Sequence, residues 1–550
     1  MWFSPWRRIL RGRSGDAKPS GLRAGTKFVE EDTGVEYTYD PVMKDWKKKV
    51  APYSAIVCKD GSTVWAEDAS RKTIASGEAG VDDASVIQSA VNAISEGKIL
   101  IRKGTYKITQ KISCPAGIFF ESEGAELDLS GLNDVTFEFG SDAETADLKL
   151  TGMRGFKVSA SSANSNTLLV KASQISRGFL LEKIMHKDLN NLAEIRGACY
   201  DATIRDCWGY DLKGVWIKLV TLDIDDVAYK PNATEIINCE LSNRWSNPGG
   251  RGIEVLSSNE DTSTGAVGTV KIHNCWIEAV NVGIYSEGKN TIISNNNIAA
   301  VDKGIHINVK QIDGIYMKNS GEAAEIIGNY INVRADAYGI YLDGASRGHI
   351  IVGNWFEYLL GTAIYCANNH RLRIIGNYIS FGSDAAVGFS GTTCHSQIEG
   401  NIFIGNVASP RGTGINTDGY YITIEGNGFV GLKYSINAPS LNGVREEGNI
   451  FYGNTNDPLL GTKYRNSGSK TFSGDGSTTD FSIGAHGLVT TDPSKIAIKV
   501  TPASSDAIAA SPCVGYVDPA DNTKIRVKFS SAPASGSENV KIVWYAEVVS

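Results

Sequence analysis

A short segment recurs ten times between residues 207 and 451, and this repetition constrains the fold more than any other feature of the sequence. Its second residue is Cys in the first three copies and Asn in the other seven, and successive copies are 21 to 36 residues apart. A near-constant period of this length, varied only by insertions, is typical of a solenoid of stacked repeats. The ten positions are Cys207, Cys239, Cys275, Asn296, Asn329, Asn354, Asn377, Asn401, Asn427 and Asn449.

A second piece follows each segment, in which a small residue precedes an aliphatic one, as in Gly283-Ile284-Tyr285 and Gly339-Ile340-Tyr341. The runs between these pieces are short and β-branched, with Gly and Asn at the corners and no helical periodicity. The sequence therefore predicts an all-β protein whose main body is a parallel β-helix.

Equivalent residues of such a coil form columns, because each strand stacks on the next at about 4.8 Å. We expect the Asn column to be structural: Asn tolerates a left-handed turn, and its amide can bond to the amides above and below. The three Cys residues of the same column are expected to act as small interior fillers.

The composition restricts the functional class. The chain has 550 residues and a net charge of −7, which argues against a general nucleic-acid-binding protein. Its nine cysteines contain no Cys-x-x-Cys pair and no spacing suited to a metal, so we expect neither a metal site, nor a cofactor, nor a disulfide framework. No apolar run reaches the roughly 18 residues of a membrane span.

Four regions are expected along the chain. Residues 1–25 form a basic and aromatic tail, which is an anchoring peptide, an interfacial membrane segment or simply disordered. Residues 26–78 contain two hairpin signals, residues 79–466 form the solenoid, and residues 467–550 form a small β-sandwich. An amphipathic helix that begins at Asp82 or Asp83 is expected to cap the first rung. The sandwich is expected to bind sugar, to drive trimerisation or to cap the last rung.

The run from Asp82 to Ile94, followed by Lys98-Ile-Leu-Ile-Arg-Lys-Gly-Thr-Tyr106, resembles the entry of pectin-lyase-like right-handed β-helix proteins, and the later Ile-Gly-Asn-Tyr-Ile repeats resemble their rungs. The resemblance covers about residues 79 to 460. It implies a right-handed, single-stranded parallel β-helix, but it does not fix an activity, because this fold serves lyases, hydrolases, esterases and adhesins.

The layout of a short N-terminal module, a capped β-helix and a C-terminal β-module is also similar to that of bacteriophage tailspikes. This resemblance implies a homotrimer that recognises, and in many cases depolymerises, host surface polysaccharide. It also implies contacts with virion tail or baseplate proteins through the N-terminal region. The missing secretion signal favours a place on a virion over ordinary export. The alternatives are a free polysaccharide lyase or glycoside hydrolase and a non-catalytic surface adhesin.

Motifs of related enzymes fit the chain incompletely. Asn416-Thr417-Asp418 resembles the first motif of polygalacturonases, but the later elements of that signature are missing. Asp223, Asp225 and Asp226 resemble the calcium ligands of pectate lyases without the matching Arg motif, so we interpret them as a solvated loop.

The second recurring piece predicts a binding surface. If its aliphatic residue points inward, strand alternation turns the next residue outward. Aromatic rings stack on pyranose faces, and carboxylates bind hydroxyls or transfer protons, so an outer stripe of both kinds suits a sugar chain. The predicted outward residues are Trp216, Glu254, Tyr285, His306, Tyr341 and Tyr365.

Carboxylates on this face are the candidate catalytic groups, namely Glu287, Asp343 and Glu254. Glu287 and Asp343 are expected two rungs apart, which corresponds to a separation of roughly 9 to 10 Å. This separation is close to the spacing of about 6.5–9.5 Å that inverting glycosidases use. The alternatives are a binding groove without hydrolysis and a face buried between subunits.

Overall fold

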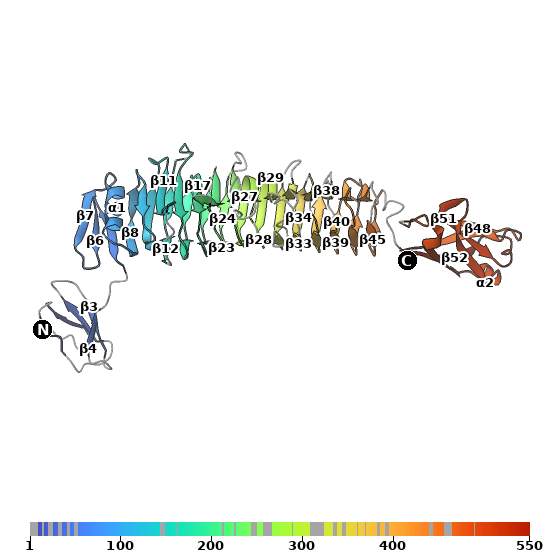
Figure 1. The fold of residues 1–550 in the computed structure, drawn as a ribbon, viewed down its shortest axis with the longest axis horizontal. Helices are drawn as coiled ribbons and strands as arrows, with labels where there is room; N and C mark the ends of the chain where they lie inside the picture. Colours follow the sequence, from blue (N-terminus) through green and yellow to red (C-terminus); the bar gives the residue numbers. More distant parts are fainter. Residues whose placement is uncertain are drawn as a thin grey trace. The chain divides into compact units, whose positions relative to one another are not determined.

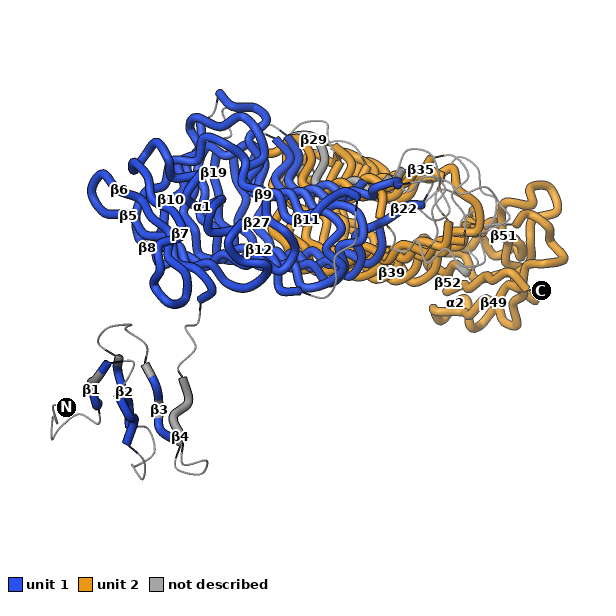
Figure 2. Tube along the Cα trace, turned by 60° about the vertical axis from the view of Figure 1, so that its left-hand side comes forward, with its two compact units in different colours: residues 1–279 blue, residues 280–550 orange. Residues whose placement is uncertain are grey.

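The structure is a computed structural model, and it describes residues 9–13, 16–19, 26–30, 36–40, 45–48, 53–143, 149–161, 163–211, 214–224, 227–243, 250–256, 267–288, 290–308, 324–333, 338–343, 348–359, 361–368, 370–381, 385–390, 395–438, 444–455, 465–488 and 490–549. Strands dominate the described part (Figure 1). The chain divides into two compact units, residues 1–279 and residues 280–550 (Figure 2).

The first unit begins with a four-stranded sheet of β1 (Ile9–Gly12), β2 (Lys27–Glu30), β3 (Glu36–Asp40) and β4 (Asp45–Lys48). The first of the two predicted hairpins is confirmed, because β2 and β3 pair in antiparallel register. Part of the predicted tail is ordered as well: β1 pairs in parallel with β2, and Leu10 is buried.

The solenoid is entered through β5 (Ala55–Asp60), β6 (Thr63–Asp68) and β7 (Thr73–Glu78), followed by the helix α1 (Asp83–Asn92) and by β8 (Gly97–Lys107). The second predicted hairpin is present as the antiparallel pair β5–β6. Since β5 also pairs in parallel with β8, residues 55–78 share the sheet of the solenoid rather than that of the N-terminal module.

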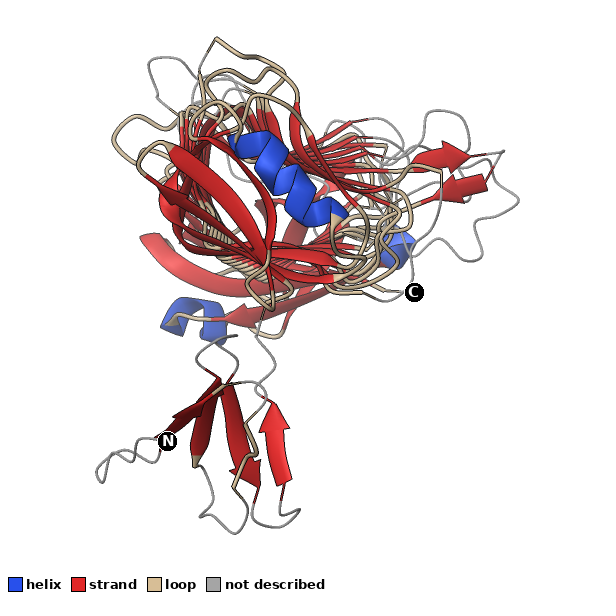
Figure 3. Cartoon of the chain, turned by 90° about the vertical axis from the view of Figure 1, so that its left-hand side faces the viewer, coloured by secondary structure: helices blue, strands red, loops and turns tan. Residues whose placement is uncertain are grey.

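Helix α1 lies across the open end of the first coil (Figure 3). Its apolar face, Val86, Ile87, Ala90 and Val91, is buried, and Asp82 is its N-cap residue, as the sequence predicts. The side chain of Asp83 is also buried, where it accepts hydrogen bonds from Lys59 Nζ at 2.7 Å and from the backbone N–H of Lys107 at 2.7 Å. The helix therefore covers apolar surface that a first rung would otherwise leave exposed.

Parallel strands build the rest of the first unit, and most pair with the strand three places later, which is the connectivity of a β-helix. A small hairpin, β21 (Leu222–Ile224) and β22 (Val227–Tyr229), forms a separate sheet. The boundary between the units falls within β27 (Trp276–Ser286). The solenoid strands of the first unit after β8 are β9 (Ile112–Cys114), β10 (Ile118–Asp128), β11 (Val135–Gly140), β12 (Thr151–Arg154), β13 (Lys157–Ser159), β14 (Leu168–Ser173), β15 (Phe179–Glu182), β16 (Met185–Lys187), β17 (Asn191–Arg196), β18 (Thr203–Arg205), β19 (Trp208–Tyr210), β20 (Val215–Val220), β23 (Thr234–Ile237), β24 (Glu240–Ser242), β25 (Arg251–Leu256) and β26 (Val270–His273).

The second unit continues the same pattern, with three strands to a rung. Inward residues such as Ile326, Phe356 and Ile374 are fully buried and fill its core. Its solenoid strands after β27 are β28 (Thr291–Ser294), β29 (Asn297–Asn308), β30 (Glu325–Ile327), β31 (Tyr330–Val333), β32 (Tyr338–Asp343), β33 (Ile350–Val352), β34 (Trp355–Leu359), β35 (Ile364–Ala367), β36 (Arg373–Ile375), β37 (Tyr378–Phe381), β38 (Ala385–Ser390), β39 (Gln397–Glu399), β40 (Ile402–Ile404), β41 (Thr413–Asn416), β42 (Thr423–Glu425), β43 (Gly428–Val430), β44 (Tyr434–Asn437), β45 (Arg445–Glu447) and β46 (Ile450–Tyr452).

The Asn column is a continuous ladder in the second unit. The side-chain amide of Asn377 donates to Asn401 Oδ1 at 2.9 Å and to the carbonyl of Ile351 at 3.0 Å, and the same Asn401 oxygen accepts the backbone N–H of Asn377 at 2.9 Å. The amide-to-amide bond recurs at 2.9 to 3.0 Å on every step from Asn296 to Asn449. The predicted structural role is thus confirmed.

The left-handed conformation, however, lies one residue earlier than the sequence suggests. Gly376, before Asn377, has φ +62°, and a Cβ added there would meet no atom within 4 Å. The position therefore favours glycine for its backbone angle and not for space, and on an earlier rung Asn295 adopts the same left-handed conformation with φ +55°. Because the preceding residue makes the left-handed turn, each Asn can turn its own amide into the coil.

In the first unit the column carries Cys207, Cys239 and Cys275, all buried. A hydrogen bond with Cys207 and burial raise the pKa of the Cys239 thiol well above its ordinary value. All three side chains act as interior fillers, as predicted.

The C-terminal region of the second unit is a β-sandwich, as predicted. One sheet has the order β47 (Arg465–Gly474), β52 (Gly536–Val548), β49 (Ile496–Pro502), and the other has the order β48 (Asp480–Ala485), β51 (Asp521–Phe529), β50 (Cys513–Asp518). The 3-10 helix η1 (Pro493–Lys495) and the short helix α2 (Ser505–Ala509) join these strands. Phe529 of one sheet and Trp544 of the other belong to one buried cluster, which holds the two sheets together.

Replacing Asn377 by Leu should lower the free energy of unfolding by about 2–4 kcal/mol, because it leaves the buried N–H groups of Asn354 without their acceptor. Urea denaturation measures this change. The matched control is Asn416→Leu: Asn416 is exposed and accepts a single amide bond, from Asn437 at 2.9 Å, so its loss should cost less than about 1 kcal/mol. Equal losses for the two variants would contradict a structural ladder.

Candidate functional site

Three tyrosines of the second unit form a surface on β32 and β35, which are equivalent strands of two successive rungs. Tyr341 and Tyr365 occupy paired positions on β32 and β35, and their rings stack at a centroid distance of 5.4 Å with an angle of 7° between planes. The third member is Tyr338, whose ring centroid lies 4.9 Å from that of Tyr341 and 5.1 Å from that of Tyr365. We call Tyr338, Tyr341 and Tyr365 the tyrosine surface. All three side chains are partly exposed.

The next rung fixes the position of Tyr365. The paired residue there is Gly388, and a Cβ added to it would lie 3.2 Å from Tyr365 Cδ2. The ring therefore leans over the space that glycine leaves, and its hydroxyl donates to Ser390 Oγ at 2.9 Å. Gly388 and Ser390 together set the height of the stacked rings.

A carboxylate of the second unit is held by another of the predicted residues. Tyr285 Oη donates a hydrogen bond to Glu287 Oε1 at 2.7 Å. Tyr285 is almost fully buried, whereas Glu287 is partly exposed. The structure thus brings Tyr285 and Glu287 together, with the ring orienting the acid rather than lying open to solvent.

The structure places His306 and Asp343 through their backbones alone. His306 pairs with Tyr341, so it belongs to the rung before the tyrosine surface, whereas Asp343 ends β32, the strand that carries Tyr338 and Tyr341. Their side chains lie outside the described residues. The predicted order of rungs, with β29 between β27 and β32, is present.

Trp216 contradicts the predicted outward stripe, because its side chain is fully buried. The reason is the register: Val215 pairs with Arg251 and Ile217 with Ile253, so Trp216 stands opposite Gly252. In the sequence Gly214 looks equivalent to Gly252, but it is equivalent to Gly250. The register therefore places Trp216 in the row of Leu192 on the preceding rung, which is also fully buried, and not in the predicted outward row.

Glu254 is 6% exposed and forms a close ion pair with Arg251 in the first unit. Its neighbour in the column is Lys218, not the predicted Trp216. Opposite charges alternate along this column from rung to rung, through Glu138, Lys171, Glu194, Lys218 and Glu254. This part of the first unit is therefore a column of alternating charges and not an aromatic stripe.

Charged partners lower the pKa of one acid of that column, Glu138. Burial opposes the ionisation of Glu138, but hydrogen bonds from Lys111 at 2.6 Å and Lys171 at 2.9 Å outweigh it and lower its pKa. Glu138 is therefore held as an ion and is a poor candidate for a general acid.

The described residues contain no group of three His, Cys, Asp or Glu side chains that could hold a metal ion. Asp223 lies in the hairpin β21–β22, while Asp225 and Asp226 fall outside the described residues. No helix in the described part of the chain is long and apolar enough to cross a membrane.

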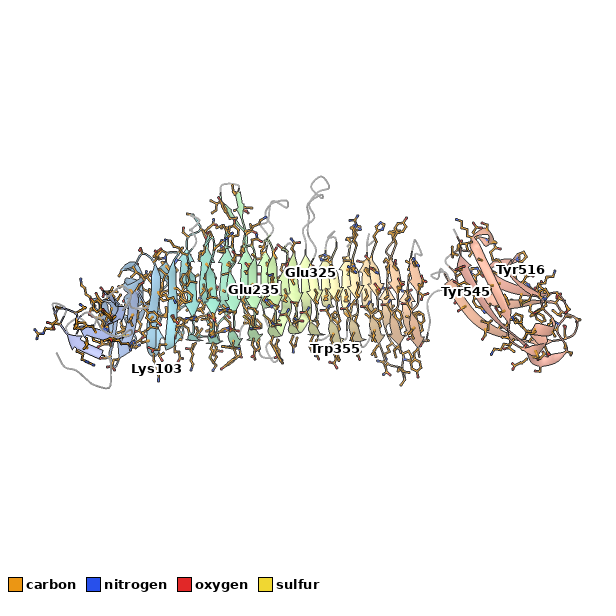
Figure 4. All side chains as sticks on the ribbon, turned by 90° about the horizontal axis from the view of Figure 1, so that it is seen from below. Lys103, Glu235, Glu325, Trp355, Tyr516 and Tyr545 are labelled. Carbon is orange, nitrogen blue, oxygen red and sulfur yellow. The ribbon has the colours of Figure 1, made fainter. Side chains whose placement is uncertain are left out.

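Sequence reasoning missed two sets of aromatic residues in the second unit. Tyr338 directly precedes the recurring Gly339-Ile340 pair, and strand alternation from the inward Ile340 does not predict that its ring joins the same surface. Tyr330, Trp355 and Tyr378 follow the ladder asparagines, and alternation from a buried Asn should have indicated that they point outward. The side chain of Trp355 projects from the second unit (Figure 4).

Comparisons with known proteins agree on the architecture. Residues 313–478 match a family described as "Right handed beta helix region", and residues 223–393 match one described as "Periplasmic copper-binding protein (NosD)". A comparison with curated proteins finds no match.

Solved structures of the tailspike protein of E. coli bacteriophage HK620 are similar over most of the chain. The protein in complex with pentasaccharide is 12% identical, with 84% of this chain and 90% of that chain covered and a TM-score of 0.54. A mutant in complex with hexasaccharide is 12% identical, with 84% and 89% covered and a TM-score of 0.55. The chain has the right-handed parallel β-helix fold of a phage tailspike. The predicted fold class is confirmed.

Gly388→Val should push the ring of Tyr365 from its place, because the new Cβ would come within 3.2 Å of it. We expect the free energy of unfolding to fall by about 1–3 kcal/mol, and a crystal structure of the variant to show the bond to Ser390 broken. Gly428→Val is the matched control, since a Cβ there meets nothing within 4 Å. If both variants are as stable as the parent protein, Gly388 does not position Tyr365.

Proposed function

We propose that the protein binds polysaccharide chains on the tyrosine surface of its second unit. The observation that carries this proposal is the parallel stack of Tyr341 and Tyr365, partly exposed on the outer face of successive rungs. Stacked rings offer flat apolar faces to pyranoses, and the adjacent column supplies hydrogen-bonding groups such as Ser390. The tailspike structures of similar fold were solved with pentasaccharide and hexasaccharide, which supports the proposal.

The biological role we propose is that of a virion tailspike that recognises host surface polysaccharide outside the cell. Its N-terminal region, with Arg7, Arg8 and Arg11 in the sequence, is the part we assign to virion tail or baseplate proteins. The protein would act as a homotrimer.

We further propose that the protein cleaves the polysaccharide as a hydrolase, with Glu287 and Asp343 as its acid and base. Glu287 is partly exposed and oriented by Tyr285. Two inter-strand steps separate β27 from β32, a backbone separation of roughly 10 Å that side chains can shorten toward the inverting range. Glu254, also predicted from the sequence as catalytic, is neutralised by Arg251 and has no such role in the proposal.

Binding is tested with Tyr341→Ala and Tyr365→Ala against arrayed O-antigen and capsular polysaccharides. Each should weaken binding about tenfold, because each removes stacking area and leaves the carboxylates in place. Tyr421→Ala is the control: this ring is exposed but stacks on His395, away from the tyrosine surface in the sequence. Wild-type affinity in both site variants would rule out this surface.

Cleavage is tested with Glu287→Gln and Asp343→Asn, which keep size and most hydrogen bonds. Release of reducing ends should fall by about 10²–10⁴, because proton transfer is lost, while polysaccharide binding is retained. Glu425→Gln, an exposed acid of β42, serves as the control and should cleave normally. If the parent protein releases no sugar, or if both amide variants cleave at the parent rate, these two residues do not catalyse hydrolysis.

Trimerisation is tested by light scattering of the intact chain at micromolar concentration. We expect three times the chain mass, since a long solenoid with a closed three-fold arrangement buries one outer face of each copy. A single chain mass would contradict the proposal.

A further inference from the structure

A second aromatic surface lies on the neighbouring strands of the same rungs. Tyr330, Trp355 and Tyr378 occupy paired positions on β31, β34 and β37, and together they form what we call the Trp355 ladder. Trp355 is 49% exposed, and its ring lies 4.8 Å from that of Tyr378, tilted by 45°. The ladder thus presents one ring on each of three successive rungs.

The fold does not require rings at these positions. The next residues on the same strands, Ile331, Phe356 and Ile379, point inward, are fully buried and supply the core. Any outward residue compatible with a strand would serve the solenoid equally well. A half-exposed Trp between two partly exposed Tyr residues is therefore better explained by a ligand than by stability.

Hydrogen-bonding groups accompany the rings. Tyr330 Oη donates to Glu357 Oε2 at 2.8 Å, which fixes that carboxylate beside Trp355 on β34. Asn332 occupies the position paired with Glu357 on the preceding rung. The ladder combines aromatic faces with carboxylate and amide groups, as a sugar-binding surface does.

The first unit shows the same combination at the equivalent positions. Trp208 and Trp276 are 41% and 48% exposed, and Glu240 pairs with both. The indole N–H of Trp276 donates to Glu278 Oε2 at 3.1 Å. The recurrence of exposed indole with carboxylate favours a repeated ligand, such as a polymer, over a single small molecule.

We propose that the Trp355 ladder is a second binding site, which takes another stretch of the same polysaccharide that the tyrosine surface binds. This inference rests on the proposed function. The rungs repeat at about 4.8 Å, close to the length of one pyranose, so a chain that runs along the coil places one sugar on each ring. A second copy of the protein is a less suitable occupant, because it would bury the Glu357 carboxylate at a cost. Fixed carboxylates also favour neutral over acidic sugars.

The test compares Trp355→Ala and Tyr378→Ala with Tyr341→Ala and the control Tyr421→Ala. The probes are neutral and uronic-acid-containing surface polysaccharides, together with pentasaccharide fragments of the polymer that binds most tightly. Trp355→Ala should weaken binding of the neutral polymer at least tenfold, because binding of the polymer at one site raises its effective concentration at the other. The affinity of the same variant for the pentasaccharide should change by no more than about twofold. Tyr341→Ala should weaken binding of both probes.

The outcomes separate the two proposals. Parent-level polymer binding by Trp355→Ala and Tyr378→Ala, with Tyr341→Ala impaired, overturns the second site alone. If Trp355→Ala binds the polymer more weakly and Tyr341→Ala binds it normally, the second site is supported and the tyrosine surface is overturned. If light scattering shows that Trp355→Ala forms a smaller oligomer than the parent protein, the ladder is a contact between copies and the inference is overturned. If the parent protein binds no polysaccharide, both proposals fall.

Discussion

The amide ladder from Asn296 to Asn449 is the interaction on which the second unit depends. Between the two ends of the ladder, each amide oxygen accepts two N–H groups from the preceding Asn, and each amide nitrogen donates to the oxygen of the next Asn, so no member can be lost without stranding its neighbours. Because the ladder fixes the corner of every rung, it also fixes which residues of the adjoining strands turn inward and which turn outward. The aromatic surfaces of β31 to β38 owe their alignment to this register.

Alignment of this kind explains how a repetitive fold can carry a ligand surface. The inward positions of each rung must stay apolar to fill the core, whereas the outward positions are free to vary. In the first unit the variation produces alternating charges, from Glu138 to Glu254, that stabilise the stack. In the second unit it produces stacked rings, which leave flat apolar area in contact with water. The same backbone therefore supports a structural face and a candidate binding face.

The fold could be predicted from the sequence because its period, its cap helix and its corner residues are local signals. The site could be predicted only in part. Tyr341 and Tyr365 follow from alternation within regular rungs, but Trp216 does not, because a two-residue shift in register between β20 and β25 is not visible in the motif Gly-Val-Trp. The role of Gly388 depends on the lean of a ring from the preceding rung, which no sequence pattern records. Likewise, the ring of buried His186 fills the space that Gly209 leaves on the next rung, and no local sequence signal indicates this contact.

The most direct test is a crystal structure of the protein with an oligosaccharide of the polysaccharide that binds most tightly. The account predicts electron density for a pyranose whose apolar face lies against Tyr341 or Tyr365, with hydroxyl groups toward Ser390 and Glu287. Density confined to the C-terminal sandwich, or to the column of alternating charges in the first unit, would contradict it.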